Sequence, residues 1–285
     1  MKKLLLPFLL AMFFIPASIT LVQAQGIKLP APSPLQTIKQ EFALSDISVS
    51  YSRPAMRGRK IMGDLVPFNN TVWRTGANQP TKLTFGEDVT IAGTPVPKGE
   101  YALYTIPAKD EWTMILSKNT ALWGSMGYKE SDDLMRFKAK STTLPSNIES
   151  FTIQFANVKP QSLDVQLMWE KTAVSFTVNT DIDARVMKQI ETAMAPSDRR
   201  PYFEAATYYY ESGKDLKQAL EWASKAVEQN PERYWVEHLK AKIQLKMGDK
   251  KGAIASAGNS MNTAKSQNNP DYVALNEKLI AEAKK

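Results

Sequence analysis

The feature that most constrains the fold of this chain is a change in the spacing of its apolar residues near position 181. Between about 40 and 180, apolar residues alternate with polar ones, as in strands with one buried and one exposed face. After 181, apolar residues recur at the spacing of an amphipathic helix. The sequence therefore predicts two parts, a β domain at 41–180 and a helical region at 181–285.

The first part carries short alternating runs, such as Phe151-Thr-Ile-Gln-Phe155 and Val174-Ser-Phe-Thr-Val178. Turn signals, most of them containing glycine, proline or asparagine, separate the runs; they lie at 92–95, 97–99, 108–110 and 144–147. Short strands with frequent turns and no helical period between them favour an antiparallel β-sandwich. About eight to ten strands of ordinary length fit this span.

The second part contains an imperfect internal repeat. Ala219, Ala226 and Pro231 match the small, small and proline positions of the second helix of a tetratricopeptide unit. The segment 200–265 therefore resembles tetratricopeptide repeats, and 271–284 is predicted to be a capping helix. The alternative is a plain helical bundle. If the repeats are genuine, we expect the helices to form a surface for a protein or peptide partner; otherwise they pack on the β domain or on each other.

The first 24 residues have the three parts of a secretory signal peptide. Lys2 and Lys3 form a basic start, a mostly apolar stretch follows, and Val22-Gln-Ala24 offers the short side chains that a leader peptidase recognises. Two prolines interrupt the apolar stretch, which favours cleavage over anchoring. We therefore predict an exported protein, periplasmic or secreted, with no membrane span after cleavage and a proline-rich linker at 25–40.

Composition excludes several classes of function. The chain has no cysteine and a single histidine, His238, which excludes thiolate chemistry, cysteine-based metal sites and a multi-histidine site within one chain. The net charge of +7 is spread over both parts rather than gathered in one dense segment, so we expect no nucleic-acid partner. No catalytic triad, phosphate-binding loop or calcium loop is recognisable. The sequence thus predicts no metal and no cofactor.

The candidate ligand site lies in two polar segments of the first part and one glycine-rich loop. Arginine forks bind carboxylate, sulfate or phosphate groups, and tryptophan faces stack on sugar rings or cations. The candidate ligand-binding residues are Arg53, Arg57, Arg59, Trp73, Arg74, Asn78 and Trp123. The alternative is structural, because loop arginines also bind acids or carbonyl groups and so hold an irregular loop in place.

Several long segments of the first part occur in a fixed order: Tyr51-Ser-Arg-Pro54, Gly58-Arg-Lys-Ile61, Leu65-Val-Pro67, Trp73-Arg-Thr-Gly-Ala-Asn78, Pro97-Lys-Gly-Glu-Tyr101 and Trp169-Glu170. In these segments the chain resembles a secreted bacterial family known only as domain of unknown function 2911. The resemblance implies a secreted β domain and gives no reaction. The chain departs from the family pattern at Gln79, where an acidic residue is expected; if that acid serves a ligand, this chain lacks the contact.

These observations favour an exported binding or interaction protein. The β-sandwich would hold an anionic or glycan ligand at its Arg/Trp loops, and the helices would engage a protein partner. Two alternatives stay open: a carboxylate-dependent hydrolase acting on envelope polysaccharide or peptide, and a purely structural envelope protein. Binding is favoured over catalysis because the sequence shows no catalytic constellation. The ligand and the oligomeric state are not fixed by the sequence.

Overall fold

The structure is a computed structural model that describes residues 29–68, 71–197 and 199–285. The predicted signal peptide, residues 1–24, lies outside the described residues. The chain divides into two compact units. Unit 1 holds the residues up to Glu41 together with Ser45–Val158 and Leu163–Val178, and unit 2 holds Phe42–Leu44, Lys159–Ser162 and Asn179–Lys285.

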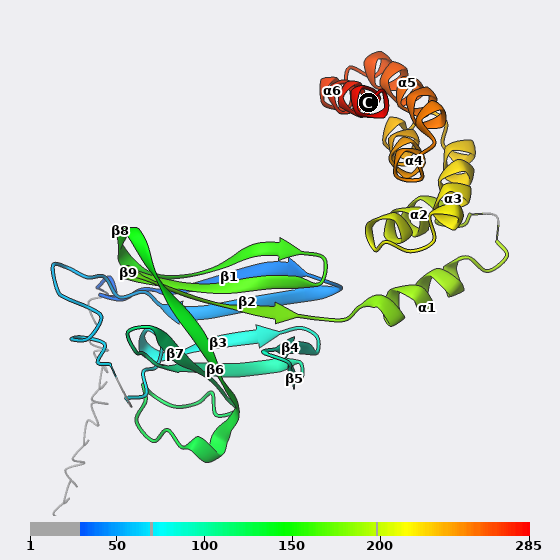
Figure 1. Cartoon of the computed structure of the whole chain (residues 1–285). Coiled ribbons are helices and arrows are strands. Elements are labelled where there is room, and N and C mark those ends of the chain that lie inside the picture. Colours follow the sequence, from blue (N-terminus) through cyan, green and yellow to red (C-terminus); the bar gives the residue numbers. More distant parts are fainter. Residues whose placement is uncertain (1–28, 69–70, 198) are drawn as a thin grey trace, which may run out of the picture. The chain divides into compact units, whose positions relative to one another are not determined.

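The strands of the described residues form one nine-stranded antiparallel sheet with the order β1-β2-β3-β6-β7-β8-β9-β4-β5 (Figure 1). They are β1 (Leu35–Phe42), β2 (Ser45–Ser52), β3 (Ala77–Phe85), β4 (Val89–Ile91), β5 (Thr94–Val96), β6 (Gly99–Ile106), β7 (Glu111–Ser117), β8 (Asp133–Lys159) and β9 (Ser162–Asn179). A short 3-10 helix, Glu130–Asp132, precedes β8. The sheet followed by helices confirms the prediction of β structure in the first part and helical structure in the second.

The sheet bends into two layers, because the 27-residue strand β8 passes from one layer to the other (Figure 1). Its first part pairs with β7 in an antiparallel register that runs from Ser117↔Asp133 to Glu111↔Lys140. The large buried side chains are mostly apolar, as the alternating pattern predicts; they include Leu83, Leu103, Met114, Phe151, Val165, Leu167 and Trp169.

Two expected loop segments are strands in the structure. The turn expected at 144–147 is not formed, because β8 continues through it. Pro145 is exposed and lies beyond Lys140, the last residue of β8 in the register with β7, so its missing N–H interrupts no bond of that pairing. The linker expected at 25–40 ends earlier, because β1 begins at Leu35.

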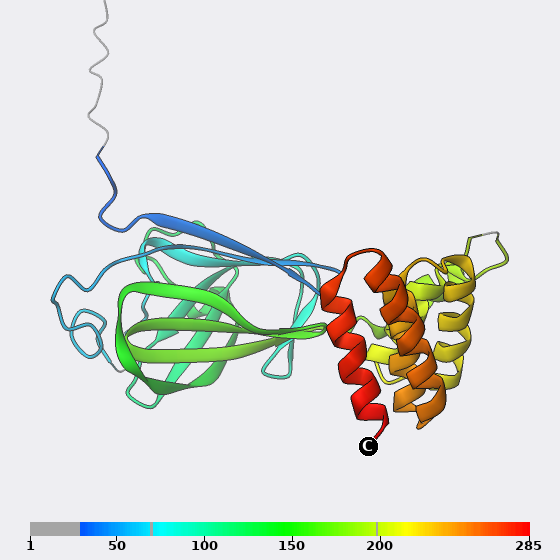
Figure 2. The ribbon, with the colours of Figure 1, turned by 90° about the horizontal axis from the view of Figure 1, so that it is seen from above.

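The described helices are α1 (Asp183–Ala193), α2 (Tyr202–Glu211), α3 (Leu216–Gln229), α4 (Tyr234–Lys246), α5 (Lys250–Ser266) and α6 (Pro270–Ala283). Side-chain caps start three of them, because the carboxylates of Asp215 and Asp249 and the amide oxygen of Asn269 accept backbone N–H groups of α3, α5 and α6. From α2 to α6, each helix packs against the next (Figure 2). Among the described residues, no helix has the length and apolar character that crossing a membrane would require.

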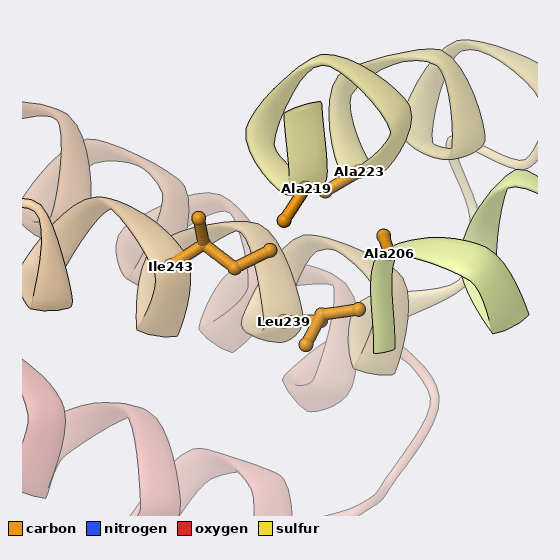
Figure 3. Close-up of a cluster of buried hydrophobic side chains, with 5 residues drawn as sticks. All are labelled: Ala206, Ala219, Ala223, Leu239 and Ile243. Carbon is orange, nitrogen blue, oxygen red and sulfur yellow. The ribbon is translucent and has the colours of Figure 1, made fainter. Parts of the chain in front are cut away.

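Small residues set the distance between the helices. Ala206 of α2 and Ala219 and Ala223 of α3 are fully buried against Leu239 and Ile243 of α4 (Figure 3). An alanine lets two helix backbones approach closely, and the larger side chains of α4 fill the remaining space. The alanines that suggested a repeat therefore occupy positions where a larger side chain does not fit.

A buried polar network joins α4, α5 and α6. The Asn276 amide donates to the Ser260 hydroxyl (2.8 Å) and to the Tyr272 carbonyl (2.7 Å). Its oxygen lies 2.7 Å from Nδ1 of His238, so Nδ1 is the protonated nitrogen of this ring. The Ser260 hydroxyl donates to the Tyr234 carbonyl (2.7 Å). Each partner is satisfied, which favours one helix register over others.

Replacement of Ala223 by leucine tests this close packing. We expect Ala223→Leu to lower the free energy of unfolding of unit 2 by about 1–3 kcal/mol, because the larger side chain forces α3 away from α2 and α4. Urea unfolding followed by the helical circular dichroism signal measures the change. Ala255→Leu makes the same chemical change at an exposed site of α5 and should stay within about 0.5 kcal/mol. Equal effects of the two variants would contradict the packing described here.

The single histidine predicts a pH dependence. Burial lowers the pKa of His238 below its usual value; the hydrogen bond to Asn276 opposes this shift, and the charge of Lys242 adds to it. The unfolded chain therefore binds a proton more readily, so the stability that neutral His238 provides is present above about pH 6.5 and is lost as the pH falls. We expect the Tm of unit 2 to fall between about pH 7.5 and 5.5 in the natural chain and to change less in His238→Gln. If the Tm of the natural chain and that of His238→Gln change equally with pH, His238 is not the cause of the pH dependence.

Candidate functional site

A loop between β7 and β8, residues 118–132, covers the outer face of β6 and β7. Ala102, Tyr104 and Ile115 are buried beneath it, and Leu122 and Tyr128 of the loop pack against them. Burial of these side chains fixes a segment that has little regular structure of its own. The loop therefore presents its remaining side chains from a rigid base.

Polar contacts hold the middle and the second half of this loop. The Tyr104 hydroxyl donates to the Gly124 carbonyl (3.3 Å), and burial together with the charge of Asp133 raises the pKa of Tyr104 to about 12. The Tyr128 hydroxyl donates to the Asp133 carboxylate (2.7 Å), and Arg136 Nε donates to the same carboxylate (2.6 Å). Burial and the bond to Asp133 raise the pKa of Tyr128 above its usual range. Both tyrosines therefore stay neutral hydrogen-bond donors at neutral pH.

A strained turn, Trp73–Asn78, lies beside this loop. The backbone of Trp73 pairs with Thr105 of β6 through N–H···O bonds of 2.7 and 2.9 Å. Thr75 is fully buried with φ of 56°, an unusual value for a β-branched residue, and its hydroxyl bonds to that of Thr105 (3.1 Å). Such strain persists only where surrounding contacts hold it, and it is concentrated at functional sites. The turn therefore fixes the direction in which Arg74 leaves the backbone.

Arg74 is the cation that these contacts leave unsatisfied. Its guanidinium lies against the backbone of Gly124, since a Cβ placed on that glycine would be 3.4 Å from Nη1. Nε of Arg74 is buried and has no hydrogen-bond partner. In the part of the chain that the structure describes, no carboxylate forms an ion pair with it. Arg74 therefore keeps its capacity to bind an oxyanion.

Two large apolar side chains of the same loop are exposed. Trp123, which precedes Gly124, is 66% exposed, and Met126 is 81% exposed. Gly124 and Gly127 adopt φ values of 68° and 78°, which glycine adopts without strain and which turn the chain sharply around these two side chains. We call Arg74, Trp123, Gly124 and Met126 the Arg74 site.

The other predicted arginines hold their own segment in place. Arg53 donates to the Phe151 carbonyl (3.1 Å) and to the Thr152 hydroxyl (2.9 Å). Nη2 of Arg57 donates to the Pro32 carbonyl (3.1 Å). Arg59 donates to the carbonyls of Met56 (3.0 Å) and Ala55 (2.7 Å). These three arginines thus hold an irregular loop in place, as the structural alternative predicted. Most of their acceptors are carbonyl groups, and none of these bonds goes to a carboxylate.

Trp73 and Asn78 also make internal contacts. Trp73 stacks on Trp169 with ring centroids 6.1 Å apart and donates through Nε1 to the Gly76 carbonyl (3.1 Å). The Asn78 amide donates to the Ser52 hydroxyl (3.1 Å) and to the Ser33 carbonyl (3.3 Å). Of the seven predicted site residues, the structure brings Arg74 and Trp123 to one loop junction and ties the others to the fold.

The support for the site includes residues that the sequence did not single out. Asp133 and Arg136 belong to β8, and their contact with Tyr128 requires the loop to return onto the sheet. The only signal for these contacts in the sequence was that Asp133 and Arg136 are three residues apart and follow Tyr128 closely. Within the described ranges, no group of three or more metal-ligating side chains could hold a metal ion.

Comparison with known proteins identifies the family and adds no activity. The model of the family described as "Protein of unknown function (DUF2911)" matches residues 33–178. The chain belongs to this family. The match spans the sheet from the residues just before β1 to the end of β9, and it includes the whole Arg74 site. No curated protein and no solved structure matches the chain.

A pair of matched variants separates a structural arginine from a free one. We expect Arg53→Met to lower the free energy of unfolding of unit 1 by about 1–3 kcal/mol, because the Phe151 carbonyl loses its charged donor. Arg74→Met keeps the apolar stem and removes an unpaired charge, so its stability should equal or exceed that of the natural chain. Unfolding followed by the near-ultraviolet circular dichroism of the tryptophans measures both. A large loss in Arg74→Met would assign Arg74 a structural role.

Proposed function

We propose that this chain is an exported binding protein whose β domain recognises an oxyanion carried on a ring, such as an acidic sugar, at the Arg74 site. The observation that carries the proposal is the buried, unpartnered Nε of Arg74, in a turn that lies against a loop held by hydrogen bonds of its own. An arginine left without an acceptor costs stability, so its presence is best explained by a partner that binds from solution.

The chemistry of a guanidinium determines which group binds there. The two Nη groups of Arg74, which are not among the buried atoms, present N–H donors that match the two oxygens of a carboxylate, sulfate or phosphate. Because the adjoining Nε is buried, such a bond would form beside surroundings of low polarity, where a charge-assisted hydrogen bond is stronger than in water. The charge of the ligand and the geometry of the fork therefore select a planar or tetrahedral oxyanion.

Trp123 and Met126 suggest what the oxyanion is attached to. An exposed indole gains most when an apolar face or the C–H face of a sugar ring covers it. Scattered apolar side chains on a surface need no explanation, but two such residues flank a glycine that touches an unpaired arginine. A ring-shaped anion uses both features at once.

Thermal shift with simple ligands tests the proposal. We expect glucuronate and galacturonate to raise the Tm of the purified protein, with glucose as the uncharged control. A ligand concentration of about 100 times Kd corresponds to a gain of about 2.7 kcal/mol in the free energy of unfolding. The shift should disappear in Arg74→Gln and persist in Arg57→Gln, which changes an exposed arginine in the same way.

Trp123→Ala separates the two parts of the site. In this variant the Tm shift caused by the acidic sugars should be smaller, whereas the Tm shift caused by sulfate should be unchanged, because only the contact with the sugar ring is removed. No response of the natural chain to any oxyanion, or an equal response in Arg74→Gln, would overturn the proposal.

Two further parts of the proposal concern the chain as a whole. Residues 1–24 direct export to the periplasm or the medium, which amino-terminal sequencing of the exported protein would test. Helices α2–α5 are two tetratricopeptide-like units that contact a protein partner, supported by the buried alanines at Ala206, Ala219 and Ala253. Recognition of the ligand thus belongs to the β domain and recognition of a protein to the helices.

A further inference from the structure

Unit 2 contains a groove that none of the contacts described so far explains. Three alternate helices line it: Tyr210 comes from α2, Lys242 and Lys246 from α4, and Lys278 from α6. These helices are neighbours, since α4 packs against both α2 and α6. The groove has a volume of about 500 Å³ and is open along one side of the stack.

The groove is basic. Among its lining residues, three are lysines and one, Glu282, is an acid. Lys242 is paired with Glu211 (3.3 Å), whereas Lys278 forms no ion pair with any described residue. Since the surrounding helix surfaces carry charges of both signs, this concentration of one sign is local.

Two of the ammonium groups are held around one ring. Nζ of Lys242 and Nζ of Lys246 each lie 4.7 Å from the centroid of Tyr210, within the range of cation–π attraction. Lys246 also donates to the Tyr210 carbonyl (3.3 Å). The ring of Tyr210 therefore positions two ammonium groups in the groove, and both would attract an anion that binds there.

Apolar side chains alternate with these charges. Leu245, Leu275 and Leu279 line the same groove, and Leu275 is 46% exposed. A ligand that is purely ionic, such as phosphate, would leave these leucines uncovered. The groove therefore suits a ligand that carries acidic and apolar groups in turn.

We propose that this groove binds an extended acidic segment of a partner protein, in which acidic and apolar side chains alternate. This inference rests on the protein contact proposed above for the helices. Neighbouring helix axes lie about 8–10 Å apart, so a ligand that contacts α2, α4 and α6 spans about 16–20 Å. An extended chain covers this distance with about five or six residues. Its carboxylates face the three lysines, and its apolar side chains cover the leucines.

Fluorescence anisotropy with a labelled peptide tests this proposal. The probe is a fluorescein-labelled hexapeptide of alternating glutamate and leucine, titrated with the purified full chain. We expect saturable binding that weakens as salt is raised, because exposed charges are screened. The same peptide with glutamine in place of glutamate should bind at least about tenfold more weakly, equivalent to about 1.4 kcal/mol.

Matched double variants assign the binding to the groove. The double variant Lys246→Gln with Lys278→Gln should bind the glutamate peptide about tenfold more weakly or worse, which corresponds to about 1.4 kcal/mol in binding free energy. Lys217→Gln with Lys251→Gln removes the same charge from exposed first-turn positions of α3 and α5 and should leave Kd within about twofold. Circular dichroism confirms that each variant is folded. Equal affinities of the two double variants would overturn the proposal.

Two further outcomes also count against it. Absence of binding by the glutamate peptide at low salt would show that the groove does not take acidic segments. Binding of polygalacturonate, an acidic polysaccharide, with no binding of the peptide would assign the groove to glycans instead. Because the Arg74 site lies in the other unit, Arg74→Gln should bind the peptide normally, so failure of one proposal leaves the other standing.

Discussion

The packing of one indole joins four strands of the sheet, β6 to β9, and positions the candidate site. Trp73 stacks on Trp169 of β9 at an interplanar angle of 17° and meets Phe151 of β8 and Trp112 of β7 with centroids 5.2 and 6.1 Å away. Aromatic contacts of this kind add directional preference to the apolar area that they bury. Because Trp73 precedes Arg74, the same contacts that close the core determine where the free guanidinium lies.

The period of the apolar residues carried most of the information about the fold. The alternation from Val174 to Val178 predicted a strand, and its apolar side chains, Val174, Phe176 and Val178, are buried in β9. The turn at 92–95 was also visible, because Ala92 and Gly93 take positive φ values between β4 and β5. The turn predicted around Pro145 was wrong. Whether a proline interrupts a sheet depends on which backbone groups have partners, and these partners come from strands distant in sequence.

The site was harder to predict than the fold, for a similar reason. Arg53, Arg57, Arg59 and Arg74 have the same chemistry in the sequence, and three of them donate to carbonyl groups that the fold happens to place within reach. Arg74 differs from the other three arginines because the loop packed over β6 and β7 lies against its guanidinium and offers it no acceptor. Sequence can therefore name the residues able to bind an anion, whereas the geometry decides which of them has no partner already.

The helical stack has a further consequence for how the chain opens. Because the helices from α2 to α6 touch mainly their near neighbours along the chain, the last helix, α6, is held chiefly by α5 and, through the Asn276 network, by α4. Amide exchange should therefore be fastest in α6 and slow progressively toward α3, apart from the turns held by the Asn276 network. Such a stack unfolds from its terminal helix first. A ligand that binds against α6 would therefore stabilise the part of the stack that opens most easily.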